Sequence, residues 1–113
     1  MSARGETILW LAQRLTAAIL AFCVLVHLAT MIYAVRGGLS AAEILGRTRG
    51  SVAWGAFYTI FVFAVAIHAA IGLRAISMEW LAFKGRAADA VMALAGVALA
   101  LMGLRAVVAV VGA

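Results

Sequence analysis

Two long stretches of this chain carry no formal charge, and they constrain the fold more than any other feature. Residues 15–35 lie between Arg14 and Arg36, and residues 50–73 lie between Arg49 and Arg74. An α-helix rises about 1.5 Å per residue, so about 20 apolar residues cross the hydrocarbon core of a bilayer. Each stretch therefore predicts one transmembrane helix.

A third apolar run begins at Ala90, meets Arg105 and continues to Ala113. It fits a third span if Arg105 lies near the far interface and its long stem carries the guanidinium outward. We therefore predict an all-α membrane protein in which one domain, 1–113, has three transmembrane helices and N- and C-termini on opposite sides. The predicted spans are about residues 15–35, 51–73 and 88–110.

The composition excludes most other classes of protein. The chain is 68% hydrophobic and 12% charged, whereas a globular domain is about 45–50% apolar and about 25% charged. Disorder, a soluble enzyme and a disulfide-stapled secreted domain are excluded, the last because Cys23 is the single cysteine. The first span is too long for the apolar core of a signal peptide, and His27 interrupts it, so we expect it to remain in the protein.

The net charge of +5 is assigned to basic flanks of membrane segments and not to nucleic-acid binding. Five basic residues fall on the side of the N-terminus and the second loop, and four fall on the other side, which slightly favours a cytoplasmic N-terminus. The first set is Arg4, Arg14, Arg74, Lys84 and Arg86, and the second is Arg36, Arg47, Arg49 and Arg105.

Two ionisable side chains, His27 and His68, lie within the first two spans. Intramembrane ionisable residues are costly and usually functional, and the lack of Asp, Glu and Lys there argues against a proton-coupled exporter. His27 shares a helix face that is more polar than the rest of its span and should face protein or cofactor. The other members of that face are Thr16, Leu20, Cys23 and Thr30.

His68 has Ala64 four residues before it and Gly72 four residues after it. Small residues on both sides would leave a flat gap in which a planar macrocycle could lie, with the imidazole as a ligand of haem iron. The alternative is that either histidine hydrogen-bonds to a neighbouring helix and that Gly72 permits close packing. Both interpretations stay open for His68 and for His27.

The two histidines are not expected to share one haem. From the side of Arg14 and Arg74, His27 lies about 18 Å deep and His68 about 8 Å deep, at 1.5 Å per residue. Two axial ligands of one iron need nearly equal depth, and ordinary helix tilts of about 20° do not remove this difference. A haem at His68 therefore needs a second ligand from another polypeptide.

Two sequence motifs resemble a known family. Residues 13–17, QRLTA, resemble the His-Arg-x-Ser/Thr-Gly motif at the first span of the cytochrome b membrane anchors of succinate dehydrogenase and fumarate reductase. Residues 68–74, HAAIGLR, with Glu79 after them, resemble the His-x-x-x-Gly-x-Arg-His-x-x-x-Asp motif at the end of their second span. Three spans and the order of the motifs agree, so the resemblance covers nearly the whole chain.

The chain also departs from the family pattern. Gln13 stands where the family has histidine, Ala17 replaces glycine, and Ala75 replaces the second histidine of the second motif. Glu79 replaces aspartate, and Trp10 stands where relatives have a serine that contacts quinone.

The resemblance implies a subunit of succinate:quinone oxidoreductase that catalyses nothing alone. It would dock a flavoprotein subunit and an iron–sulfur subunit, beside a second membrane-anchor subunit, in electron transport linked to the tricarboxylic acid cycle. The location implied is the bacterial inner (cytoplasmic) membrane. The implied cofactors are haem b and a quinone, either ubiquinone or menaquinone.

The resemblance also implies roles for single residues. His68 would be an axial ligand of haem b, and His27, followed by Leu28, is similar to the first-span ligand of two-haem members. Arg74 would contact a haem propionate, and Arg14 with Trp10 would contact quinone. By default Arg14 and Arg74 are interfacial anchors, and Trp10 also suits an aromatic belt.

The competing hypothesis is a cofactor-free small oligomeric membrane transporter or packing subunit. In the third span, Gly96, Ala100 and Gly103 form a small-residue face that is best interpreted as helix packing. His68 together with the Arg14 motif argues against this hypothesis, because a packing subunit needs neither.

Overall fold

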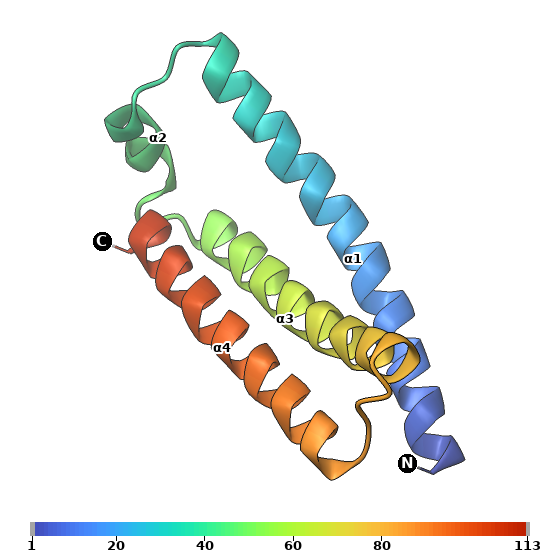
Figure 1. The fold of residues 1–113 in the computed structure, drawn as a ribbon. Coiled ribbons are helices and arrows are strands. Elements are labelled where there is room, and N and C mark those ends of the chain that lie inside the picture. Colours follow the sequence, from blue (N-terminus) through green and yellow to red (C-terminus); the bar gives the residue numbers. More distant parts are fainter. Residues whose placement is uncertain (1, 113) are drawn as a thin grey trace.

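A computed structural model describes residues 2–112, which form four helices (Figure 1). The helices are α1 (Ala3–Arg36), α2 (Ala41–Thr48), α3 (Val52–Trp80) and α4 (Arg86–Val111). By length and composition, α1, α3 and α4 can each cross a membrane. The predicted all-α fold with three candidate spans is confirmed. All three helices extend beyond the apolar segments on which the prediction was based.

Serine side chains begin two of the long helices. Ser2 accepts a hydrogen bond from the Gly5 N–H at 3.1 Å, and Ser51 accepts one from the Trp54 N–H at 3.1 Å. Such caps satisfy backbone donors that have no partner in the first helical turn. The last long helix follows Gly85, whose φ of 93° is a backbone conformation that glycine adopts readily.

Helix α2 is the element that the sequence analysis did not predict. Its start is a capping box, in which the Ser40 side chain accepts from the Glu43 N–H and the Glu43 carboxylate accepts from the Ser40 N–H. A serine followed three residues later by glutamate is a known signature of a helix start. The connector between the first two spans is therefore ordered, and it lies across one end of the molecule (Figure 1).

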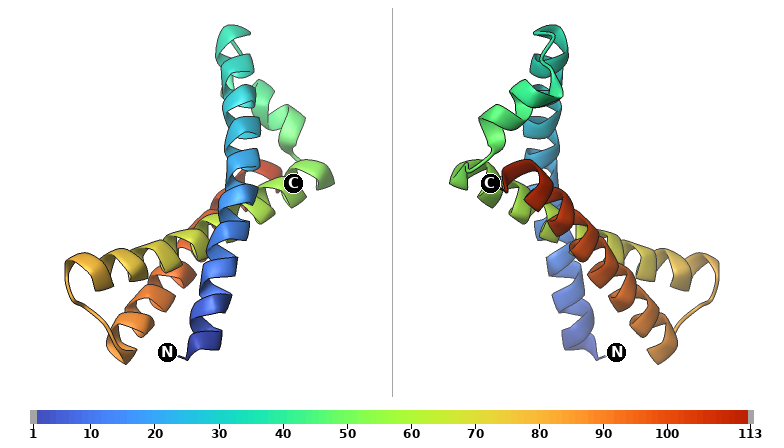
Figure 2. Two further views of the ribbon diagram at one scale, coloured as in Figure 1. Left: turned by 90° about the vertical axis from the view of Figure 1, so that its right-hand side faces the viewer. Right: turned by 90° about the vertical axis from the view of Figure 1, so that its left-hand side faces the viewer.

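Helices α3 and α4 form an antiparallel pair, and α1 crosses that pair at an angle (Figures 1 and 2). A Cβ on Gly103 would stand 2.5 Å from Cγ1 of Val62, and one on Gly96 would stand 3.1 Å from the Ala70 Cβ. The small-residue face of the third span is thus confirmed as a packing surface. The start of α1 and the end of α4 lie at opposite ends of the molecule (Figure 1).

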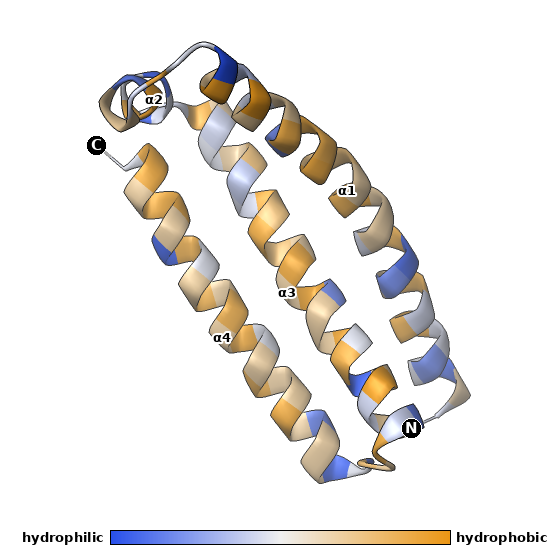
Figure 3. Ribbon diagram, turned by 45° about the horizontal axis from the view of Figure 1, so that its top comes forward, coloured by the Kyte–Doolittle hydropathy of each residue, from blue (hydrophilic) through white to orange (hydrophobic). Residues whose placement is uncertain are grey.

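Little of the described chain is buried within itself. No large side chain of residues 2–112 is fully buried, and many large apolar side chains of the three long helices are exposed. Apolar residues cover the middle of these helices and polar residues collect toward their ends (Figure 3). A surface of this kind is stable against lipid or against other membrane subunits.

Candidate functional site

His68 on α3 faces α1, where its ring meets a threonine. The Nδ1 atom of His68 is 3.2 Å from the Thr16 hydroxyl oxygen. That hydroxyl has one proton, which it donates to the Ala12 carbonyl at 2.8 Å, with the Gln13 carbonyl 3.1 Å away. With the hydroxyl proton on a backbone carbonyl, Thr16 is an acceptor for a ring N–H at Nδ1, and in that tautomer Nε2 has a free lone pair.

This arrangement fits a metal-bound histidine. A histidine that ligates a metal usually donates its other ring N–H to an acceptor, which fixes the tautomer and the ring orientation. At His68 the acceptor is Thr16, which is buried. The residues present therefore fit a haem whose iron is bound through Nε2 of His68.

The Gln13 side chain lies beside Gly72. A Cβ on Gly72 would stand 3.4 Å from Nε2 of Gln13, and the same Nε2 donates to the His68 carbonyl at 3.3 Å. That distance is an ordinary contact with the movable end of a side chain. The flat gap for a macrocycle and the alternative of close helix packing at Gly72 therefore both stay predictions.

Gln13 also leaves one polar atom without a partner. Its Oε1 is buried and accepts no hydrogen bond from residues 2–112. A buried acceptor without a donor is costly and calls for a partner from outside the chain. Gln13 stands where the resembled family has histidine, so this position is polar in both.

Arg74 ties three helices together at the end of the molecule nearest the N-terminus. Its Nε donates to the Asp89 carboxylate on α4 at 2.8 Å, and its Nη2 donates to the Glu6 carboxylate on α1 at 3.3 Å. The Arg74 side chain is 14% exposed. The sequence analysis noted Glu79 as the acidic position of the family pattern. The structure gives Arg74 the partners Asp89 and Glu6, which were not predicted.

Arg14 and Trp10 lie one helical turn apart on α1, on an exposed face. The Arg14 guanidinium carbon is 5.2 Å from the centre of the Trp10 ring, which is cation–π distance. Trp10 is 58% exposed. The two predicted quinone residues therefore contact each other, and they do not contact His68.

His27 belongs to a second cluster, toward the other end of α1. Its Nδ1 is 3.4 Å from the Tyr58 hydroxyl, and its ring meets the rings of Tyr58 and Phe61 edge to face. Thr16, which contacts His68, precedes His27 by eleven residues, or about 16 Å along the helix. Within this chain the two histidines occupy separate sites. On the polar face of α1, Thr16 and Cys23 are buried, as predicted.

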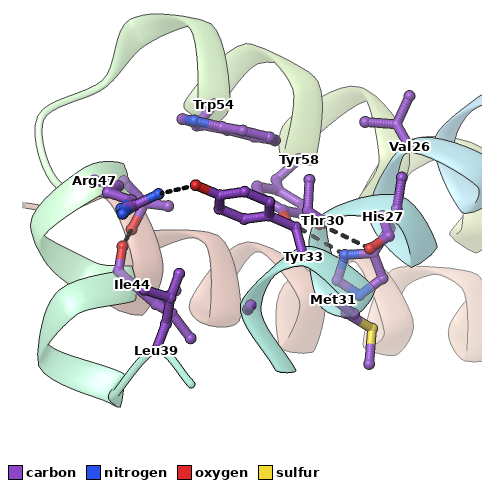
Figure 4. Close-up of a pocket in the computed structure, with 13 residues that line it drawn as sticks. Val26, His27, Thr30, Met31, Tyr33, Leu39, Ile44, Arg47, Trp54 and Tyr58 are labelled. Atoms are coloured by element: carbon purple, nitrogen blue, oxygen red, sulfur yellow. Dashed lines mark hydrogen bonds between the residues drawn. The ribbon is translucent and has the colours of Figure 1, made fainter. Parts of the chain in front are cut away.

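A cavity of about 650 Å³ opens beside His27. It lies where the second half of α1, the connector, α2 and the start of α3 meet (Figure 4). Most of its lining is apolar or aromatic, and Arg47 is the charged residue among those that line it. The lining residues are Val26, His27, Ala29, Thr30, Met31, Tyr33, Ala34, Leu39, Ile44, Arg47, Thr48, Trp54 and Tyr58.

The sequence analysis assigned no role to Tyr33, Arg47 or Tyr58. Their only shared signal was an aromatic or basic position close to a predicted span end. That signal did not indicate that three different helices bring them to one cavity.

Comparison with known families decides between the two hypotheses from the sequence. Residues 1–104 match the family described as succinate dehydrogenase/fumarate reductase transmembrane subunit. The chain belongs to this family. It is an integral membrane protein and a membrane subunit of the succinate dehydrogenase/fumarate reductase complex, as the two sequence motifs indicated. No curated protein and no solved structure matches it significantly.

Proposed function

We propose that this subunit anchors the flavoprotein and iron–sulfur subunits of a succinate:quinone oxidoreductase and carries haem b at His68. The observation that supports the haem is the bond between His68 Nδ1 and Thr16, which leaves Nε2 free to ligate. When bound, haem b would supply one-electron transfer. His68 would hold the iron, and Thr16 would orient the imidazole.

The second axial ligand would come from a sister anchor subunit. His27 is the other histidine of the chain, and it lies in a separate cluster about 16 Å further along α1. The exposed apolar faces of the three long helices offer a surface for such a neighbour. A second haem at His27 stays a prediction, because Tyr58 can donate to Nδ1 or accept from it and the tautomer is not fixed.

Arg14 and Trp10 would form this subunit's contribution to the quinone site. Arg14 lies at the predicted start of the first span, at the depth where an amphipathic quinone head group would stop. A fixed cation there stabilises negative charge that develops on the quinone oxygens.

The test of the haem assignment is His68→Ala in the intact complex. The reduced-minus-oxidised absorption spectrum should lose the bands of this haem. Succinate oxidation with a soluble artificial acceptor should persist, because the flavin site lies on another subunit. A mutant complex with an unchanged spectrum and redox potential would contradict the proposal.

A further inference from the structure

The cavity beside His27 is large enough for a bound molecule and is not part of the His68 site. Its volume of about 650 Å³ falls within the range of about 300–1,000 Å³ that small-molecule sites occupy. Such sites are mostly apolar, with a few polar groups that fix the orientation of the ligand. Here the positions of those polar groups indicate which class of molecule fits.

Several polar groups inside the cavity hydrogen-bond to other parts of the chain. The His27 ring contacts the Tyr58 hydroxyl, and the Thr30 hydroxyl donates to the His27 carbonyl at 2.7 Å. The Thr48 hydroxyl donates to the Val110 carbonyl on α4 at 2.7 Å. Most of the remaining lining is apolar or aromatic, which suits a hydrocarbon chain.

The rim of the cavity, in contrast, carries the cationic guanidinium of Arg47. Arg47 donates through Nη1 to the Tyr33 hydroxyl at 3.3 Å, and its guanidinium carbon lies 5.6 Å from the centre of the Tyr33 ring. A guanidinium has five N–H donors, so most of them remain available. Figure 4 shows the Tyr33 ring between Arg47 and the His27 side of the cavity.

No carboxylate of residues 2–112 forms an ion pair with Arg47. The acid nearest in sequence on the same helix is Glu43, which caps α2. Hydrogen bonds to the backbone and side chain of Ser40 hold the pKa of Glu43 below its usual value, and the charge of Arg47 one turn further along α2 contributes less to the same shift. Arg36 and Arg49 flank the same end of the molecule, so the rim attracts an anion.

We propose that this cavity binds an anionic phospholipid, with its phosphate on Arg47 and an acyl chain between α1 and α3. Arginine pairs with phosphate through two parallel N–H bonds, which is stronger than a bond to a neutral group. Arg47 lies outside the predicted spans, in the connector between the first two, and the cavity extends from it to residues of the first span. The site does not depend on the haem proposed at His68.

The test counts phospholipid that stays bound to the intact complex. The complex is purified in mild detergent, incubated with equal phosphatidylglycerol and phosphatidylethanolamine, and examined by native mass spectrometry. Arg47→Gln should lower retained phosphatidylglycerol about tenfold, as expected for the loss of a charge-assisted bond. Arg49→Gln, the matched loss of a cation at the same end that does not line the cavity, should lower retention much less than Arg47→Gln.

Two further variants separate ligand binding from the shape of the site. Tyr33→Phe removes the Arg47–Tyr33 hydrogen bond but keeps the ring and the cation, so it should retain the lipid. Ala34→Phe adds bulk to the lining and keeps Arg47, so it should lose the lipid. The absorption spectrum of the His68 haem should be the same in all four variants.

Three results would overturn the proposal. The first is equal phosphatidylglycerol retention in Arg47→Gln and the unmodified complex. The second is an equal loss of phosphatidylethanolamine, which would show that the head group is not recognised. The third is loss of a quinone or a second haem from Ala34→Phe with no change in phospholipid, which would assign the cavity to that molecule.

Discussion

The two intramembrane histidines lie in contacts between the same two helices, yet their surroundings differ. His68 meets α1 where the helices pack closely, and the Thr16 hydroxyl beside its Nδ1 has backbone carbonyls to which it can give its own proton. His27 lies beside a cavity, and its Tyr58 contact leaves the tautomer open. The partner of its second nitrogen, and not its depth alone, therefore marks His68 as the stronger candidate for a metal ligand.

The two ends of the molecule also differ in how their arginines are paired. At one end Arg74 is engaged by the carboxylates of Asp89 and Glu6, and three helices are tied together. At the other end Arg47 hydrogen-bonds to the neutral Tyr33 and forms no ion pair within residues 2–112, and α2 borders an open cavity. The first arrangement stabilises the chain internally, whereas the second leaves a cation for a molecule from outside.

The largest effect that would separate the two histidines is expected from Thr16→Val. This change keeps the side-chain shape but removes the acceptor of His68 Nδ1, and loss of such a partner usually costs about 10–100-fold in metal affinity. Haem per complex, measured by absorption after expression under limiting haem, should fall. Thr16→Ser should retain the haem, and Tyr58→Phe beside His27 should leave the His68 haem unchanged. Full occupancy and an unshifted spectrum in Thr16→Val would contradict the tautomer argument.

A second effect tests the exposed face of α1 near the His68 end. Arg14→Leu should lower succinate:quinone electron transfer by about tenfold or more, because charge on the quinone oxygens loses a fixed cation. Succinate oxidation by an artificial soluble acceptor should stay nearly intact, and Arg49→Leu at the opposite end should change neither rate. If both activities fall together, Arg14 mainly holds the complex together. If neither falls, Arg14 is an interfacial anchor and the quinone site lies elsewhere.

The long helices were predictable because charge is excluded from the hydrocarbon core, so the arginines around residues 15–35 and 50–73 mark them out directly. The packing role of Gly96 and Gly103 was predictable for a related reason, since small residues let membrane helices approach. Helix α2 was missed, although Ser40 and Glu43 carry its start signal. An eight-residue helix between two spans adds no apolar segment that hydropathy would reveal.

The contacts of the candidate site were harder to predict than its helices. That His68 matters followed from its position, but its bond to Thr16 depends on the rotation of α1 against α3, which helical spacing does not give. The same limit explains why the position of the Gln13 side chain beside Gly72 was not predicted. The partner of Arg74 is Asp89, across a turn and on the next helix, which no spacing within one motif indicates.

The smallest expected effect concerns the ion pairs of Arg74. Each pair joins a side chain that is 14% exposed to a carboxylate that is about half exposed, 53% for Glu6 and 45% for Asp89. Pairs of this kind contribute about 0.5 kcal/mol each, so Arg74→Gln should lower the free energy of unfolding by about 1 kcal/mol. Thermal denaturation of the purified complex would measure the change. The difference should shrink at high salt, because salt screens exposed charges.

Arg86→Gln is the matched control for Arg74→Gln, because Arg86 lies at the same end of the molecule and makes no ion pair within residues 2–112. It should leave stability unchanged. The redox potential of the haem distinguishes the two roles considered for Arg74, an ion-pair partner within the chain and a contact of a haem propionate. A propionate would be a third carboxylate on one guanidinium, so we expect the redox potential of the haem to stay the same in Arg74→Gln. A shifted potential with unchanged stability would assign Arg74 to the haem, and the contrast between the two ends would then rest on Arg47 alone.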